Sequence, residues 1–433
     1  MIQNIKGYSY NDLTLVPAVI SNVSSRSECN QFIKDKFLPI FTAPMASVVN
    51  FENYETFLDN GIIPIIPRNI SLEVRKDLMN DQQWVALSLK EFEDLFINNY
   101  LDRIDDFRTH YFICVDIANG HMKSLYEKCH TAKKNAITGK YKLTIMTGNI
   151  ANPETYKWIC EFNRLCGNNV IDYIRVGIGG GSGCITTSNV SIHYPQASLI
   201  DGCYQVKQSL LSLHDHLGEL KYNKSLFPKI VADGGIRNYD HVIKALALGA
   251  DYVMIGSVFA QCIESAGIKI NKNVSQKALI KFPIENYKDL RVDSKGNVYG
   301  YYKESYWKHL LEPWQEKIDK TKKDFAEYKL DLLKYEERKK SLMEEKCIGP
   351  MDVKFFGMAS ADGQKSISGK KTKTAEGITK YLPVKYTLSG WVENMISYLR
   401  SAMSYCNCFT LEEFIGSPTL IVNSISEIQA VNK

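Results

Sequence analysis

The chain has 433 residues, of which 45% are hydrophobic and 23% are charged. This is the composition of a soluble globular protein with enough apolar residues for a large core, and the length exceeds that of a typical single domain. The formal net charge of +5 is small for this length and is not gathered in one patch, so neither nucleic acid nor a membrane is the expected partner.

The first residues, Met1–Gly7, lack the basic start and apolar run of a signal peptide. No apolar stretch approaches the roughly 20 residues that cross a bilayer. The eleven cysteines are odd in number and contain no C-x-x-C pair, which indicates reduced thiols rather than a disulfide framework. The expected location is therefore cytoplasmic.

Short apolar runs alternate with helix-like segments along most of the chain. The runs are nearly continuous in hydrophobic residues, as expected for parallel strands buried on both faces. Helix-like segments between them include Leu72–Asn80, Lys90–Asn99, Pro153–Leu165 and Tyr239–Leu248. Eight such units predict a (β/α)₈ TIM barrel of the α/β class. The expected strands are Pro39–Ala43, Ile62–Ile66, Trp84–Leu87, Tyr111–Asp116, Lys142–Met146, Val170–Val176, Lys229–Ala232 and Asp251–Ile255.

The βα pattern stops after the eighth expected strand. Lys303–Lys346 holds twelve Lys or Arg and eleven Asp or Glu, and its apolar residues from Trp314 to Leu342 follow a four-three spacing. One helix over Trp314–Met343 would be about 45 Å long. A helix that folds back on a partner such as Trp307–Leu311 is the alternative.

Beyond this region, Ala359–Lys380 is rich in Ser, Gly, Lys and Thr, which predicts a mobile flap. Trp391–Tyr405 then resumes helical periodicity as the eighth barrel helix. We therefore expect a catalytic barrel over 1–267 and 350–433, with a helical arm or hairpin inserted at 268–349. The insertion and the flap both lie between strand 8 and helix 8, and the sequence does not identify a partner for the arm.

A glycine-rich stretch follows the sixth expected strand. Val176–Thr187 places five glycines around Ser182, then Cys184, with Thr186 two residues on. Glycines allow positive φ and close approach to a ligand, and their amides can surround an anion. A cysteine at the end of such a loop is a candidate nucleophile, with a buried structural cysteine as the alternative.

Two glycine turns follow the last two strands. They are Asp233-Gly-Gly235 and Gly256-Ser257, and loops after strands 7 and 8 of this fold commonly bind phosphate. Backbone amides of both turns can donate to the phosphate, and Asp233 can accept hydrogen bonds from ribose hydroxyls. The turns indicate a phosphate ligand without specifying a reaction.

Together with the Cys184 loop, these turns resemble the family of IMP dehydrogenases and GMP reductases. The resemblance extends over the chain outside the insertion. Further matching segments are Tyr10–Pro17, Ser25–Glu28, Val115–Gly120, Gly148–Ile150, Phe355–Met358 and Leu399–Ser401.

Two features favour the reductase branch of this family. The dehydrogenases usually carry a regulatory pair of cystathionine-synthase-type domains between early barrel elements, and Arg68–Trp84 leaves no room for it. They also place an Arg-Tyr dyad on the flap, whereas this chain has no arginine between Arg338 and Arg400. The resemblance therefore implies an NADPH-dependent oxidoreductase that deaminates GMP reductively to IMP and ammonia.

The resemblance also implies catalytic roles. The Cys184 thiolate would attack the purine C2 and form a covalent thioimidate, while Thr186 and Glu376 would assist proton transfer as ammonia leaves. NADPH would then deliver hydride to C2. By the same resemblance the nucleotide contacts are Ser182, Asp233, Gly234, Gly235, Gly256, Ser257, Gly357, Met358, Ala359 and Gly377.

Other implied contacts concern the cofactor, an ion and neighbouring subunits. Backbone carbonyls of Gly179, Gly181 and Cys184 would form a monovalent-cation (potassium) site. The family is tetrameric, so a homotetramer is expected, with Ser25 and Arg26 reaching a neighbour's cofactor. Together with these two, the cofactor-facing residues are Arg68, Asp116, Ile117, Ala118, Ile178, Gly179 and Ser401.

Departures from the family pattern keep three alternatives open. Arg68-Asn69, Gly180, Gly183 and Lys373-Thr374 differ from the usual residues. One alternative is an IMP dehydrogenase without regulatory domains, in which a base such as Lys373 activates water for the oxidation of IMP by NAD to XMP. A flavin-dependent barrel that uses the same phosphate turns is the second. The third is an inactive barrel whose arm binds a partner.

Overall fold

The computed structural model describes residues 6–99, 109–181, 186–213, 222–271, 291–300, 304–321, 325–343, 346–369 and 377–423. Its central element is an eight-stranded parallel sheet. In chain order the strands are β2 (Ile40–Thr42), β3 (Ile65–Ile66), β4 (Trp84–Leu87), β5 (His110–Val115), β6 (Lys142–Ile150), β7 (Tyr173–Val176), β8 (Lys229–Asp233) and β9 (Tyr252–Ile255).

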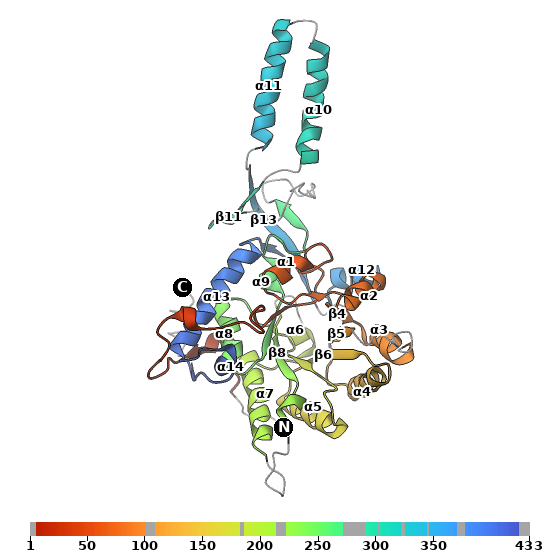
Figure 1. Cartoon of the computed structure of the whole chain (residues 1–433), viewed down its shortest axis with the longest axis vertical. Helices are drawn as coiled ribbons and strands as arrows, with labels where there is room; N and C mark the ends of the chain where they lie inside the picture. The colour runs from red at the N-terminus through yellow and green to blue at the C-terminus, as the bar shows by residue number, and fades with distance from the viewer. Residues whose placement is uncertain are drawn as a thin grey trace.

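The sheet closes on itself between β2 and the residues that precede β3. The Ile63 N–H donates to Ile40 O at 3.0 Å, and the Thr42 N–H donates to Ile63 O at 2.9 Å. On its other edge β2 pairs with β9. The predicted (β/α)₈ barrel is therefore confirmed, and Figure 1 shows its helices around the strands.

Helices follow the strands, and local sequence sets where they begin. Ser88 caps the first helix after β4 in a capping box with Glu91, and Asn152 caps a helix that has Pro153 in its first turn. The barrel helices are α1 (Tyr54–Asp59), α2 (Leu72–Asn80), α3 (Leu89–Glu93) continued by η3 (Asp94–Asn98), α4 (Lys123–Thr138), α5 (Pro153–Cys166), α7 (Gln196–Leu211), α8 (Tyr239–Ala247) and α13 (Leu388–Tyr405).

Shorter elements complete the barrel. The strands β1 and β15 pair antiparallel, and so join the two ends of the described chain. These elements are η1 (Tyr10–Asp12), β1 (Leu13–Leu15), η2 (Arg26–Glu28), α6 (Thr186–Val190), η5 (Lys224–Leu226), α9 (Ser257–Ala260), α14 (Leu411–Phe414) and β15 (Leu420–Val422).

Aromatic side chains fill the barrel near the amino-terminal ends of its strands. The Phe41 ring lies 5.4 Å from Trp84 and 5.0 Å from Tyr252, and Trp84 lies 5.3 Å from Tyr173, measured between centroids. Trp84, Tyr173 and Tyr252 are the first residues of their strands. Because these rings occupy the interior at this end, a ligand can enter only at the carboxyl ends of the strands.

A second sheet lies between β9 and α13, and the sequence analysis did not anticipate it. Its long central strand pairs antiparallel with three others, and Val298, Met351, Val353 and Val384 form a small core beneath it. The strands are β10 (Lys269–Asn271), β11 (Arg291–Val292), β12 (Asn297–Gly300), β13 (Lys346–Phe356) and β14 (Thr379–Pro383). The segment expected to be a flap contains helix α12 (Ala361–Ser368), which Ser360 caps.

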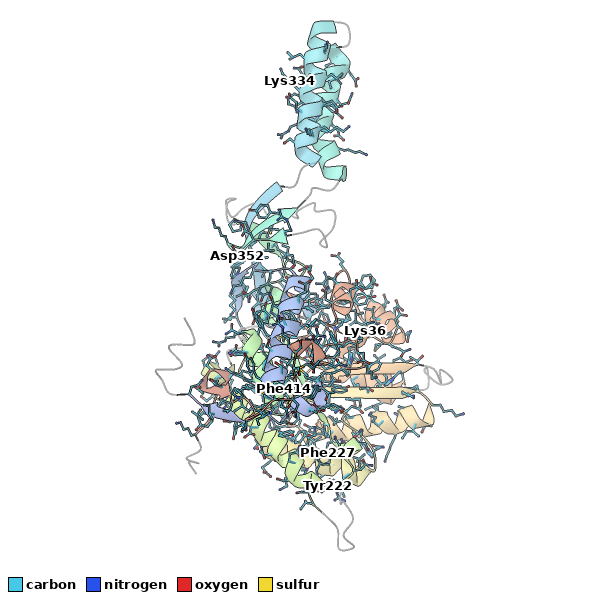
Figure 2. The ribbon with its side chains drawn as sticks, turned by 60° about the vertical axis from the view of Figure 1, so that its left-hand side comes forward. Lys36, Tyr222, Phe227, Lys334, Asp352 and Phe414 are labelled. Atoms are coloured by element: carbon cyan, nitrogen blue, oxygen red, sulfur yellow. The ribbon has the colours of Figure 1, made fainter. Side chains whose placement is uncertain are left out.

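Two antiparallel helices extend from this sheet, α10 (Glu304–Thr321) and α11 (Phe325–Met343). Figure 2 shows Lys334 of α11 far from the barrel residue Phe414, with Asp352 between them. The single helix over Trp314–Met343 is wrong, because one helix ends at Thr321 and the next begins at Phe325.

The four-three spacing describes the packing of these two helices only in part, because the expected seam residue Ile318 of α10 is buried. Leu332, an expected seam residue, is 36% exposed, whereas the neighbouring Asp331 is buried. The Asp331 carboxylate pairs with Lys317 Nζ of α10 at 2.8 Å. The spacing therefore holds at Ile318 of α10 and fails at Leu332 of α11.

No helix in the described ranges is long and apolar enough to cross a membrane. The nine cysteines whose side chains are described are all free thiols.

The first prediction concerns a buried ion cluster at the amino-terminal end of the barrel. Asp251 accepts from the Ile230 N–H at 2.8 Å and pairs with Lys207 at 3.2 Å and Lys229 at 3.1 Å. Asp251→Ala should lower the free energy of unfolding by about 3 kcal/mol, because it leaves the buried Lys207 ammonium unpaired. Urea unfolding followed by circular dichroism measures the change.

Glu127→Ala is the matched control, because it removes an acidic partner from the exposed Lys123–Glu127 pair. It should change the free energy of unfolding by less than about 0.5 kcal/mol. Equal losses in the two variants would contradict the assignment of Asp251 as a buried charge partner.

Candidate functional site

A cavity of about 210 Å³ lies at the carboxyl ends of the barrel strands. Its walls come from the ends of β2, β8 and β9, the glycine-rich loop after β7, and the segment around α12. It brings together all the expected nucleotide contacts that lie in the described ranges: Asp233, Gly234, Gly235, Gly256, Ser257, Gly357, Met358, Ala359 and Gly377.

The turn after β8 is held close to the glycine-rich loop. Gly235 adopts φ +76°, a left-handed conformation that favours glycine, and its N–H donates to Gly180 O at 3.0 Å. The two loops are therefore joined directly, and Gly180, Gly181 and Gly235 line the same cavity.

The loop after β7 begins at a glycine for a steric reason. Gly177 has φ +138°, and a Cβ there would lie 2.1 Å from Asp233 O. Gln196 Nε2 donates to Val176 O at 2.7 Å, and His193 Nδ1 lies 3.0 Å from Ile178 O, so α7 and the segment before it support the start of the loop. Its first half is thus fixed against β8.

An arginine that the sequence analysis did not single out connects the two carboxylates of the site. Arg175 Nη1 lies 2.8 Å from Asp116 Oδ1, and Nη2 lies 2.9 Å from Asp233 Oδ2. Arg68 Nε pairs with the other oxygen of Asp116 at 3.1 Å, and Asn149 Nδ2 donates to Asp233 at 2.7 Å. The network spans β5, β6, β7 and β8 and fixes the position of Asp233.

The network sets the charge states of Asp116 and Arg175. Burial raises the pKa of the Asp116 carboxyl, but Arg175 and Arg68 outweigh that effect and hold the pKa below its usual value. Burial lowers the pKa of the Arg175 guanidinium, and its acidic neighbours, Asp233 first, more than reverse that shift. Asp116 therefore stays ionised at neutral pH and Arg175 stays charged.

Arg175 could have been detected in the sequence as a charged residue inside an apolar strand. The segment Val170–Val176 was interpreted as continuous and hydrophobic. A lone arginine in a strand buried on both faces must find an acidic partner inside the protein. That requirement would have connected it to the aspartates at the ends of neighbouring strands.

Cys114 lies beneath the network, with its Sγ 3.8 Å from Arg175 Nη1. Burial raises the pKa of this thiol to about 12, despite the nearby guanidinium. Cys114 is therefore protonated at neutral pH and is not a candidate nucleophile.

The expected cofactor contacts fall into two groups. Asp116 and Arg68 belong to the ion network, Ile117 and Ala118 follow Asp116, and Ile178 and Gly179 lie in the loop after β7. Ser25, Arg26 and Ser401 do not line the cavity. They form a separate group, in which Arg26 Nη1 donates to Ser401 Oγ at 3.3 Å.

The expected catalytic residues Cys184 and Glu376 lie outside the described residues, as does the expected nucleotide contact Ser182. Thr186 begins helix α6, but its side chain is likewise not described.

The cation site is only partly described, because Cys184 is one of its three carbonyl donors. Gly179 O accepts from Thr187 Oγ1 at 3.3 Å. Within the described ranges no three His, Cys, Asp or Glu residues are placed to hold a metal ion. The carbonyl site for a monovalent cation remains a prediction.

Residues 96–280 match the family model described as IMP dehydrogenase / GMP reductase domain. A GMP reductase of Helicobacter pylori (strain G27) is 30% identical over 286 residues, which are 63% of this chain and 77% of the relative. GMP reductases of Bacillus thuringiensis (strain Al Hakam) and Streptococcus agalactiae serotype V are 29% and 28% identical, over 63% and 62% of this chain and 76% and 74% of their own lengths.

These matches extend over most of each relative, and the matched model includes β5 to β9, whose ends form the cavity. The chain belongs to the IMP dehydrogenase / GMP reductase family.

Proposed function

We propose that the protein is a GMP reductase, which converts GMP and NADPH to IMP, ammonia and NADP⁺. The observation that carries this proposal is the cavity itself, where Asp233, the two glycine turns and the Gly357–Ala359 segment meet under the loop that leads to Cys184. The curated relatives named GMP reductase support it, as does the absence of arginine between Arg338 and Arg400.

The cavity suits a purine nucleoside monophosphate. The amides of Gly235, Gly256 and Ser257 surround the region between β8 and β9, where they would donate to the 5′-phosphate. Asp233, held by Arg175 and Asn149, would accept from the ribose hydroxyls. Gly357, Met358 and Ala359 would contact the base, which places its C2 toward the loop that carries Cys184.

The chemistry would proceed in two balanced steps. The Cys184 thiolate forms a bond to C2 of GMP while the exocyclic C2–N bond breaks, and the departing amine takes up protons and leaves as ammonia. A hydride from NADPH then adds to C2, the C–S bond breaks, and the electron pair returns to sulfur, which yields IMP and NADP⁺. Thr186 and Glu376 would move the protons, because an amine is a poor leaving group until it is protonated.

The remaining assignments follow the same proposal. Asp116, Arg68 and the adjoining residues Ile117, Ala118, Ile178 and Gly179 would face the nicotinamide cofactor. Carbonyl oxygens of Gly179, Gly181 and Cys184 would hold a monovalent cation such as K⁺, a ligand type that suits a hard cation. Ser25, Arg26 and Ser401, grouped away from the cavity, would meet the cofactor of a neighbouring subunit in a cytoplasmic homotetramer.

The direct test is turnover of GMP with NADPH by the purified protein, followed as loss of the nicotinamide absorbance. We expect steady oxidation of NADPH that depends on GMP, with release of IMP and ammonia in equal amounts. Turnover of IMP with NAD, and none of GMP, would instead assign the chain to the dehydrogenase branch. A yellow preparation with bound flavin would contradict both.

Cys184→Ala should abolish turnover but leave binding of GMP largely intact, because affinity rests on the phosphate and ribose contacts. Steady-state kinetics and calorimetric titration with GMP measure the two effects. Cys166→Ala, at the end of α5, is the control and should retain full activity. An active Cys184→Ala variant would exclude the covalent route.

Arg175→Leu should weaken GMP binding by at least about tenfold and lower the free energy of unfolding by about 3 kcal/mol, because it leaves two buried carboxylates without their shared partner. For Arg175→Lys, both the affinity for GMP and the free energy of unfolding should lie between those of Arg175→Leu and wild type, since a lysine cannot bridge both carboxylates as a guanidinium does. Titration calorimetry and urea unfolding measure both. Wild-type affinity in Arg175→Leu would contradict its role in holding Asp233.

A further inference from the structure

A lysine on strand β14 points inward, where the strand's other inward residue is apolar. Along Thr379–Pro383 exposed and half-buried residues alternate, and Lys380 shares the half-buried face with Leu382. Leu382 packs against the hydrophobic core. An ammonium on that face loses part of its hydration, which is unfavourable unless an anion compensates it.

Lys380 faces the same side of the sheet as a residue that lines the cavity. Phe355 of β13 is its direct partner across the antiparallel pair, so the two side chains lie on one face. Lys380 Nζ lies 5.7 Å from the centroid of the Phe355 ring. Phe355 is a wall residue of the 210 Å³ cavity, and Lys380 lies beside this ring, although it is not itself a wall residue.

The cations that line this cavity are Arg175 and Arg237. Arg237 follows the turn after β8, two residues beyond Gly235, and is exposed at the cavity mouth. Among the residues that the structure describes, neither Arg237 nor Lys380 has a carboxylate within ion-pair distance. Elsewhere at this end of the barrel the cations are paired, as Arg68 and Arg175 are with Asp116 and Asp233.

The two cations are close enough to influence each other. Burial lowers the pKa of the Lys380 ammonium, and the positive charge of Arg237 lowers it further. Arg237 lines the cavity whose glycine turns present amide donors, and Lys380 lies beside the wall residue Phe355. This arrangement is unfavourable in the empty protein and becomes favourable when an anion binds.

Resting on the proposed function, we propose that Arg237 and Lys380 together bind the 5′-phosphate of the nucleotide substrate. A phosphate monoester carries close to two negative charges at neutral pH, and the backbone amides of the turns supply hydrogen bonds but no net charge. The two side chains provide the matching positive charges, and Arg237 also offers a planar set of donors that suits phosphate.

NADPH, if it is the cofactor, also carries a phosphate monoester, at its 2′ position. The substrate phosphate is favoured because Arg237 follows directly on the Gly234-Gly235 turn, and because Asp233 at the start of that turn is the ribose contact in the same cavity. Of the expected cofactor contacts, Asp116 lines this cavity, whereas Ile117, Ala118 and Ile178 do not.

Calorimetric titration of the full-length protein with GMP and with guanosine tests the assignment. Arg237→Met and Lys380→Met should each weaken GMP binding by about tenfold, and the double variant by about a hundredfold, as expected for the loss of charge-assisted hydrogen bonds. Guanosine, which lacks the phosphate, should bind every variant within about twofold of wild type. Lys380→Arg, which keeps the charge, should restore most of the affinity for GMP.

Lys385→Met is the matched control, because it removes the same charge from an exposed lysine near the end of the same strand. It should leave both titrations unchanged. The proposal would be overturned if the variants lost affinity for GMP and guanosine equally, or if the double variant bound GMP as tightly as wild type.

The remaining outcomes are equally distinct. The variants could instead bind GMP normally but bind NADPH more weakly, with their affinity for NADH unchanged. That result would overturn the assignment to the substrate and point to the cofactor phosphate. A wild-type protein that binds neither GMP nor IMP would contradict the proposed function itself.

Discussion

The pairing of one buried guanidinium with two carboxylates is the interaction on which the site depends. Arg175 lies inside the barrel on β7 and reaches Asp116 at the end of β5 and Asp233 at the end of β8. Without it, two acidic groups would lie in a poorly solvated space with only Arg68 and Asn149 to compensate them. With it, Asp233 is held in place at the wall of the adjoining cavity.

The rest of the barrel makes this arrangement possible. Aromatic rings fill the amino-terminal half of the interior, so the polar network is confined to the carboxyl ends of the strands. Gly177 lets the loop after β7 pass so close to Asp233 that a Cβ would collide with its carbonyl. The hydrogen bond from the Gly235 N–H to Gly180 O then joins this loop to the glycine turn after β8. The first half of the loop that leads to the candidate nucleophile is thereby fixed against Asp233, the proposed ribose contact.

The elements that could be predicted from the sequence are those whose structure is determined by the residues within the element itself. Runs such as Trp84–Leu87 are buried on both faces in any parallel barrel, and glycine turns after strands 7 and 8 are typical of a phosphate site in this fold. Arg175 was missed because its partners lie 59 residues before it and 58 residues after it, and only the closed barrel brings them together. The sheet built on β13 was missed for a related reason: β10 and β12 that flank it are short, and their partner lies beyond the two helices α10 and α11. The place of Lys380 could not be predicted either, because it depends on the pairing of β14 with β13, which sets Lys380 opposite Phe355.

The central claim is that a purine nucleotide lies in the cavity with its ribose on Asp233 while Arg175 continues to hold that carboxylate. A crystal structure of the protein with GMP tests this most directly. The account predicts ribose hydroxyls within hydrogen-bond distance of Asp233, the phosphate between the turns at Gly235 and Gly256, and an intact Arg175–Asp233 pair. GMP bound elsewhere, or Asp233 turned away from the ribose, would contradict it.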